Sequence, residues 1–255
     1  MARGLPRTSL SASALVRTLE ELAVADPADT RQSFGERVGQ WLDFKDAITL
    51  YSVLNGGAGS GAKPAAGASS GARAALQAEL ARVRSTLTDA IQADGLLDPG
   101  RTTKKLHPAA MPGSTEGTAD FVPCHRYYLA HQRNMSTSIG ALRAQARAVL
   151  AEHSPSLKRL AALDGVLEQA LGARERSLLG TLPQLLARRF EHLFEIHRRA
   201  LIDAQTPDDP DQWLQPGGWL AAFCRDMHGV LMGELELRLQ PVLGLVEALG
   251  KEVTE

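Results

Sequence analysis

The sequence contains few β-branched aliphatic residues: Ile and Val together number 17, against 38 Leu and 38 Ala. Leu and Ala lose little side-chain freedom in a helix, whereas Ile and Val favour the pleated surface of a strand. No run of residues alternates apolar and polar side chains with the Val, Ile and Thr content typical of strands. The sequence therefore predicts an all-α fold of six or seven helices, arranged as an elongated helical bundle.

Cysteines and long apolar runs are also scarce. Cys124 and Cys224 are the two cysteines and lie far apart in the chain, which argues against a disulfide framework and favours a reducing compartment. No window approaches the roughly 18 uninterrupted apolar residues of a membrane-spanning helix. The first apolar stretch ends at Arg17 and is too short for a signal peptide. We therefore expect a cytoplasmic protein without a transmembrane segment.

Charge is nearly balanced overall but unevenly distributed. The formal net charge is −1, which gives the whole molecule no long-range attraction for nucleic acid or anionic lipid. Residues 95–150 carry seven basic and three acidic groups, whereas residues from 202 onward carry ten acidic and three basic groups. This asymmetry predicts that the C-terminal section docks on the basic middle section, within the chain or between subunits. An external partner is the alternative.

Two segments are predicted to be flexible linkers. Residues 55–72 contain six glycines, one proline and no large apolar side chain, so burial cannot offset the entropy of ordering them. Residues 95–119 combine prolines and glycines with the basic trio Arg101, Lys104 and Lys105, as disordered or functional loops do. The predicted parts between them are an N-terminal helical segment (1–54), an amphipathic helix (73–94) and a helical bundle or coiled-coil body (120–255).

Apolar residues repeat with helical spacing outside these linkers. The N-terminal segment has Leu15, Leu19 and Leu22 on one helix face, and then Phe34, Val38, Trp41 or Leu42, Ile48 and Tyr51 on the next. Two seams of the coiled-coil type follow. They consist of Leu76, Leu80, Val83, Leu87 and Ile91, and of Phe121, Tyr128, Met135, Leu142 and Val149, the second accompanied by His125, Gln132, Ile139 and Ala146.

Prolines interrupt two long helical patterns in the C-terminal half. Pro183, shortly after Gly180, predicts a kink or break in the pattern over 155–203, because proline removes a hydrogen bond and crowds the preceding turn. Pro241 predicts a second kink in the pattern over 216–252. The predicted apolar faces are Leu157, Leu160, Leu167, Leu171, Leu178, Leu182, Leu185, Leu193 and Ile196, and then Leu220, Phe223, Met227, Leu231, Leu235, Val242, Leu245 and Leu249.

Histidines and cysteines suggest one alternative, a metal- or ligand-dependent enzyme. Cys224 and His228 are four residues apart on a predicted helix and share a face at metal-ligand spacing, and Cys124, His125 and His131 could supply further ligands. A two-residue pair arises easily by chance, however, and Cys224 lies beside the apolar seam, where a free cysteine simply packs. We therefore predict no metal, no cofactor and no catalytic residue.

Enzyme motifs are missing from the sequence. It has no phosphate-binding loop, no GxGxxG after a strand, no HExxH and no GxSxG. The carboxylate pairs Glu191/Glu195 and Glu234/Glu236 are interpreted as solvated helix faces.

Nucleic-acid binding is a second alternative. Arg126, Tyr127, Tyr128 and Arg133 interleave aromatic and basic side chains, which can stack on bases and pair with phosphates. Tyr128 belongs to the apolar seam, however, and the net charge is not basic. Nucleic acid is therefore not the expected partner.

Several stretches resemble an uncharacterised proteobacterial family of about this length, a domain-of-unknown-function family. They are SALVRTLEEL, RQSFGERVGQWLDFKDAITL, DFVPCHRYYLAHQ, SPSLKRLAALDGVLEQALGARERSLL and WLAAFCRDMHGVLMGELELRLQPVLGLVEAL. The resemblance implies no defined activity or site residues. Genes of that family neighbour genes for MotA-like and OmpA-like membrane proteins, which implies a cytoplasmic helical accessory of an envelope-associated complex.

The seams and the resemblance together favour a non-enzymatic helical interaction or scaffold protein. We expect it to dock through its heptad-type seams on protein partners, which are a second copy of the chain or a membrane complex. The two alternatives stay open: a metal- or ligand-binding enzyme that uses Cys124, His131, Cys224 and His228, and a nucleic-acid-binding accessory protein.

Overall fold

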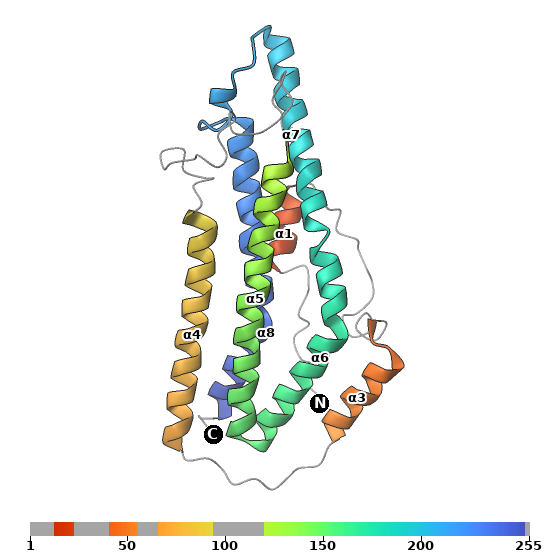
Figure 1. Ribbon diagram of the computed structural model, residues 1–255, viewed down its shortest axis with the longest axis vertical. Coiled ribbons are helices and arrows are strands. Elements are labelled where there is room, and N and C mark those ends of the chain that lie inside the picture. Colours follow the sequence, from red (N-terminus) through yellow and green to blue (C-terminus); the bar gives the residue numbers. More distant parts are fainter. Residues whose placement is uncertain (1–12, 23–40, 56–65, 94–119, 253–255) are drawn as a thin grey trace, which may run out of the picture. The chain divides into compact units, whose positions relative to one another are not determined.

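α-Helices form nearly all of the regular structure. The computed structural model describes residues 13–22, 41–55, 66–93 and 120–252, and none of these residues forms a strand. The prediction of an all-α helical bundle is confirmed (Figure 1). Its helices are α1 (Ala14–Glu21), α3 (Phe44–Asn55), α4 (Ala66–Ala93), α5 (Val122–His153), α6 (Pro155–Leu179), α7 (Leu182–Ala204) and α8 (Trp219–Glu252), with a short 3-10 helix, η3 (Pro210–Gln212), before α8.

The chain forms two compact units, and neither is continuous in sequence. The first comprises Met1–Asp29, Asp89–Gln132 and Leu182–Leu237, and the second comprises Thr30–Thr88, Arg133–Thr181 and Arg238–Glu255. α1 belongs to the first unit and α3 to the second. Residues 120–255 are likewise divided between the units.

Leucine-rich seams supply the core of both units. All five predicted seam residues of α4 and all eight of α8 are buried. Burying one such side chain stabilises the fold by about 1.5–3 kcal/mol, so these regular seams explain why both helices are long. α8 continues through Pro241, so this proline does not end the helix.

The seam of α5 shifts around the helix along its length. Tyr128, Met135 and Leu142 are fully buried as predicted, but Phe121 and Val149 at the two ends are only half-buried. A straight helix has 3.6 residues per turn, so a repeat of seven drifts by about 20° per heptad relative to the buried side. Leu150 is fully buried in place of Val149 for this reason.

The predicted interruption near Pro183 is confirmed as a break between two helices. α6 ends at Leu179, Gly180 caps it, and α7 begins at Leu182 with Pro183 in its first turn, where a missing N–H costs nothing. The predicted face is only partly correct, because the buried side of α6 passes through Leu157, Ala161, Gly172 and Leu179. Leu178 and Ile196 are about half exposed; the side chains buried instead are Leu179, Leu186 and Phe190.

The structure describes part of the first predicted linker and none of the second. α4 begins at Ala66, inside the predicted linker 55–72. Alanine has the highest helix propensity, so the helix stabilised by the α4 seam extends back into the AGASSGA sequence. Residues 56–65 and the second predicted linker, 95–119, lie outside the described residues, as do Phe34 and Val38.

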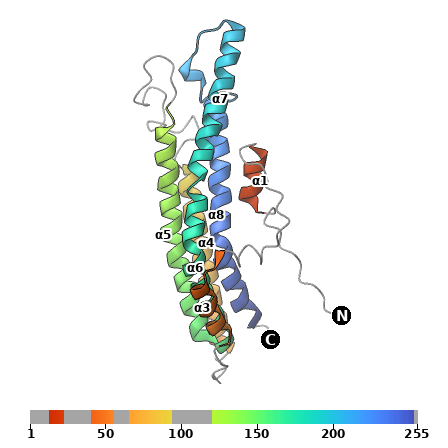
Figure 2. The same cartoon turned by 90° about the vertical axis from the view of Figure 1, so that its right-hand side faces the viewer.

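α1 packs against α8 within the first unit (Figure 2). Ser13 caps the start of α1: its hydroxyl accepts a hydrogen bond from the Val16 N–H at 3.2 Å. Leu15 is buried. A Cβ atom at Gly233 would lie 2.8 Å from the Leu15 Cα, so this close helix contact requires glycine in α8.

None of the helices in the described part of the chain combines the length and apolar character needed to cross a membrane.

Candidate functional site

The most exposed apolar surface of the described chain lies on α3. Phe44, Ile48, Tyr51 and Leu54 are 83%, 53%, 69% and 61% exposed. Their spacing of four, three and three residues places them along one side of the helix. We call these four side chains the α3 stripe. Scattered apolar residues are normal on a protein surface, but a contiguous row of four marks an interaction surface.

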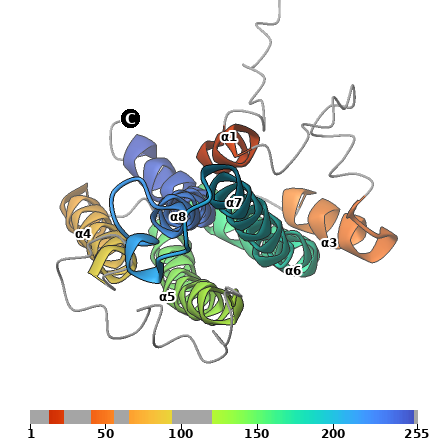
Figure 3. The ribbon, with the colours of Figure 1, turned by 90° about the horizontal axis from the view of Figure 1, so that it is seen from above.

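The opposite side of α3 faces its own unit. α3 packs beside α6, as Figure 3 shows. Leu50 and Val53, which are less exposed, lie on the side of the helix away from the stripe. Just before α3, the guanidinium carbon of Arg174 lies 5.2 Å from the centre of the Trp41 ring, a cation–π contact with α6.

Local hydrogen bonds hold both ends of α3. At its start, the Asp46 N–H donates to the Asp43 carboxylate at 2.8 Å, and the Asp43 N–H donates to the Asp46 carboxylate at 3.4 Å. This reciprocal pair is a capping box. At its end, the Asn55 amide donates to the Tyr51 carbonyl oxygen at 3.1 Å. α3 is 12 residues long and has no buried residue, yet its ends are defined by its own side chains.

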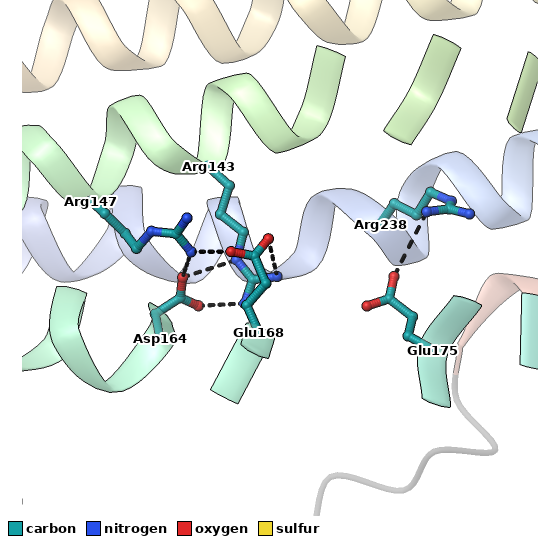
Figure 4. Close-up of polar contacts among 6 residues, drawn as sticks. All are labelled: Arg143, Arg147, Asp164, Glu168, Glu175 and Arg238. Atoms are coloured by element: carbon teal, nitrogen blue, oxygen red, sulfur yellow. Dashed lines mark hydrogen bonds and ion pairs between the residues drawn. The ribbon is translucent and has the colours of Figure 1, made fainter. Parts of the chain in front are cut away.

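An ion-pair network joins α5 to α6 in the second unit (Figure 4). Arg143 donates two hydrogen bonds to Asp164, at 2.7 and 2.9 Å. Arg147 donates to Asp164 at 3.1 Å and to Glu168 at 2.5 Å. Burial lowers the pKa of Arg143, but the hydrogen bond to Asp164 and the nearby carboxylates raise it more, so its net shift is upward. The guanidinium therefore stays charged.

This network is a structural clamp between adjacent helices. Its arginines come from the basic middle section, but their carboxylate partners come from α6. The C-terminal section, from residue 202 onward, supplies none of these partners. Within the described chain, Arg143 and Arg147 therefore pair with α6 and not with the acidic C-terminal section. A second pair, Arg238 with Glu175 at 3.8 Å, links α8 to α6 in the same unit.

A buried polar cluster lies between α5 and α8 in the first unit. Glu234 is fully buried, which corrects its interpretation as part of a solvated helix face. Its carboxylate accepts hydrogen bonds from the Tyr128 hydroxyl at 2.6 Å and from the Gln132 amide at 3.0 and 3.1 Å. The sequence contains a signal for this burial, because Glu234 lies seven residues after Met227 and so falls on the apolar face of α8.

The residues of the metal hypothesis do not form a metal site. Cys124 and Cys224 lie close enough to interact electrostatically, but both are buried, and burial raises the pKa of each thiol to about 12. Burial also lowers the pKa of His228, whose buried Nε2 has no hydrogen-bond partner. His131 stacks edge-on against Tyr127, with ring centres 4.4 Å apart. Within the described ranges, no three His, Cys, Asp or Glu side chains are placed to hold a metal ion.

The tyrosines of the nucleic-acid hypothesis serve the fold. Tyr128 is fully buried and bonded to Glu234. The Tyr127 hydroxyl donates to the Ile91 carbonyl oxygen at 3.2 Å and so ties α5 to the end of α4.

Comparison with known proteins identifies one family. The model of a family described as a protein of unknown function (DUF3348) matches residues 1–251. No curated protein and no solved structure matches the chain.

Proposed function

Because the chain belongs to the DUF3348 family, whose function is unknown, we propose a function from its surface: a non-enzymatic helical interaction protein that docks through the α3 stripe. The observation that carries the proposal is a row of four large apolar side chains, each more than half exposed, on one side of a single helix. The predicted docking seams of α4 and α5 are buried within the chain. They are therefore not available to a partner.

The spacing of the stripe favours binding to an apolar groove in a partner protein. Anchors at positions i, i+4 and i+7 are the pattern with which an amphipathic helix enters an apolar groove. A helix of 12 residues is about 18 Å long, and two such helices side by side bury less than the roughly 1,200 Å² of a stable interface. A groove that surrounds the stripe buries more of each side chain than a second flat helix does.

The charges around the stripe favour a protein over a lipid surface. Residues 43–55 contain two aspartates and one lysine, and residues 47–55 contain no charged side chain. Helices that lie on membranes are rich in Lys and Arg on their polar face. The ends of α3 are capped by its own side chains, which defines the helix that carries the stripe.

The resemblance noted in the sequence suggests where this partner is found. We propose that it is a component of an envelope-associated complex and that the protein is a cytoplasmic accessory of that complex. Metal-dependent catalysis and nucleic-acid binding have no such surface behind them: Cys124, Cys224 and Tyr128 are buried, whereas Arg126 and Arg133 are exposed.

Photocrosslinking from two neighbouring positions tests the proposal. A photoreactive phenylalanine derivative is placed at Tyr51, within the stripe, or at Thr49, which is exposed on another side of α3. The protein is then irradiated in cells. We expect one saturable crosslinked species from position 51 and none from position 49. Excess wild-type protein should suppress the crosslink, whereas excess Ile48→Glu protein should not. Equal crosslinking from both positions would contradict the proposal.

A further inference from the structure

A pocket lies in the first unit beside the connection that runs from α7 through η3 into α8. This connection is drawn in blue in Figure 1. Its volume is about 660 Å³, which is within the range of pockets that bind ligands or partner side chains. Leu193, Ile196 and Ala200 line it from α7, and Trp213, Trp219 and Ala222 line it from the η3 and α8 side. The pocket is therefore mainly apolar.

Asp208 fixes the wall of this pocket. Its carboxylate accepts a hydrogen bond from the Trp213 indole N–H at 2.8 Å and lies 2.9 Å from the His197 Nε2. The Trp213 and Trp219 rings are 5.3 Å apart and nearly edge-to-face. These contacts hold the wall of the pocket in one arrangement, and a rigid binding surface lowers the entropic cost of binding.

The rim of the pocket is acidic. The segment 200–224 contains Asp203, Asp208, Asp209 and Asp211 and no lysine or arginine. Asp209 caps η3 by accepting a hydrogen bond from the Asp211 N–H at 3.1 Å. Asp203 and Asp211 are exposed, and their carboxylates make no ion pair with the described part of the chain. Asp203 follows Ile196 by seven residues and so lies on the pocket side of α7.

The nearest arginines of α7 do not neutralise this rim. Arg198 and Arg199 pair with Glu195, at 3.8 and 3.0 Å. By helical spacing, these three residues lie on the side of α7 opposite Leu193 and Ala200. A mainly apolar pocket beside exposed carboxylates complements a ligand that is apolar and positively charged.

We propose that this pocket binds a basic amphipathic segment of a partner protein. An apolar side chain of that segment packs on Ile196 and Ala200 of the pocket lining. A flanking Lys or Arg pairs with Asp203 or Asp211. The pocket belongs to the first unit and the α3 stripe to the second. This second docking site is therefore independent of the first, and either can fail without the other.

Peptide binding to the full-length protein tests this site. The probe is a fluorescently labelled helical peptide of lysine and leucine, and fluorescence anisotropy gives its dissociation constant. A peptide with glutamate in place of every lysine is the control peptide. Asp203→Asn with Asp211→Asn removes the rim charge, and Ala200→Phe fills the pocket from an exposed helix position. Glu195→Gln, on the opposite side of α7, is the control variant.

We expect the lysine peptide to bind and the glutamate peptide not to bind. The double asparagine variant should weaken binding at least about threefold, Ala200→Phe at least about tenfold, and Glu195→Gln not at all. Equal binding of both peptides, or unchanged binding to the two pocket variants, would overturn the proposal. Replacing Arg101, Lys104 and Lys105 with glutamine should leave binding unchanged. Tighter binding to that variant would show that the chain's own basic segment is the occupant and would also overturn it.

Discussion

Replacing Ile48 and Tyr51 together with glutamate should abolish partner binding while leaving the fold intact. Both side chains are more than half exposed in the isolated protein, so a charge there costs the fold little. In the complex, each would lose the burial of a large apolar side chain, about 1.5–3 kcal/mol. Together the two replacements should weaken binding at least about a hundredfold. The affinity of the crosslinked partner, measured by titration with each purified variant, checks this.

The matched control for this variant lies on the same helix. Thr49→Glu with Ser52→Glu adds the same two charges at exposed positions outside the α3 stripe. We expect nearly wild-type affinity for it, and thermal unfolding curves of both double variants should coincide with that of the wild type within a few degrees. Equal loss of affinity in the two variants would mean that net charge decides binding, rather than the stripe.

The largest loss of stability is expected for Phe223→Ala. Phe223 is fully buried, and its ring centre lies 5.0 Å from that of Phe190 and 6.1 Å from that of Phe121. Removing such a ring leaves a cavity among α5, α7 and α8 of the first unit, which costs about 3–5 kcal/mol. This is a large part of the roughly 5–15 kcal/mol that stabilises a typical domain. Urea unfolding monitored by circular dichroism measures the change.

Phe44→Ala makes the same chemical change on the surface. Phe44 is 83% exposed, so its removal should change the free energy of unfolding by less than about 0.5 kcal/mol. The same variant should weaken partner binding, because Phe44 belongs to the α3 stripe. A destabilisation of Phe44→Ala comparable with that of Phe223→Ala would show that α3 is buried in the folded protein.

Sequence periodicity predicts the buried seams well when they are long and regular. The seams of α4 and α8 needed no information beyond spacing, because a helix with a continuous apolar face must bury it. The same argument places Ile48 and Tyr51 on one side of a helix but does not say what covers that side. An apolar face that binds a partner and one that faces the core have the same period, so the exposure of α3 could not be predicted.

Two other features depend on contacts between distant segments. Glu234 appears in the sequence as one of a pair of surface carboxylates, and only the positions of Tyr128 and Gln132 on α5 show how its burial is satisfied. Similarly, leucine spacing places Leu178 on the apolar face of α6, but the structure exposes Leu178 and buries Leu179. Which of two adjacent leucines faces the core depends on the helices packed against α6, and spacing alone does not determine this.

The pocket between α7 and α8 could not be predicted from the sequence either. Its acidic rim was visible as a run of aspartates after residue 202, and its tryptophans are among only three in the chain. The pairing of Asp208 with Trp213 and His197, however, depends on how the connection folds around η3. Spacing rules describe helices, and they give no information about such a connection.

Hydrogen–deuterium exchange with and without the partner identified by crosslinking tests the docking role of α3 most directly. Mass spectrometry reports backbone amide exchange along the whole chain in one measurement. In the isolated protein, α3 should exchange faster than α4 and α8, because none of its residues is buried. Binding should slow exchange most strongly in residues 43–55. Unchanged exchange there, with new protection confined to other helices, would contradict docking through the α3 stripe.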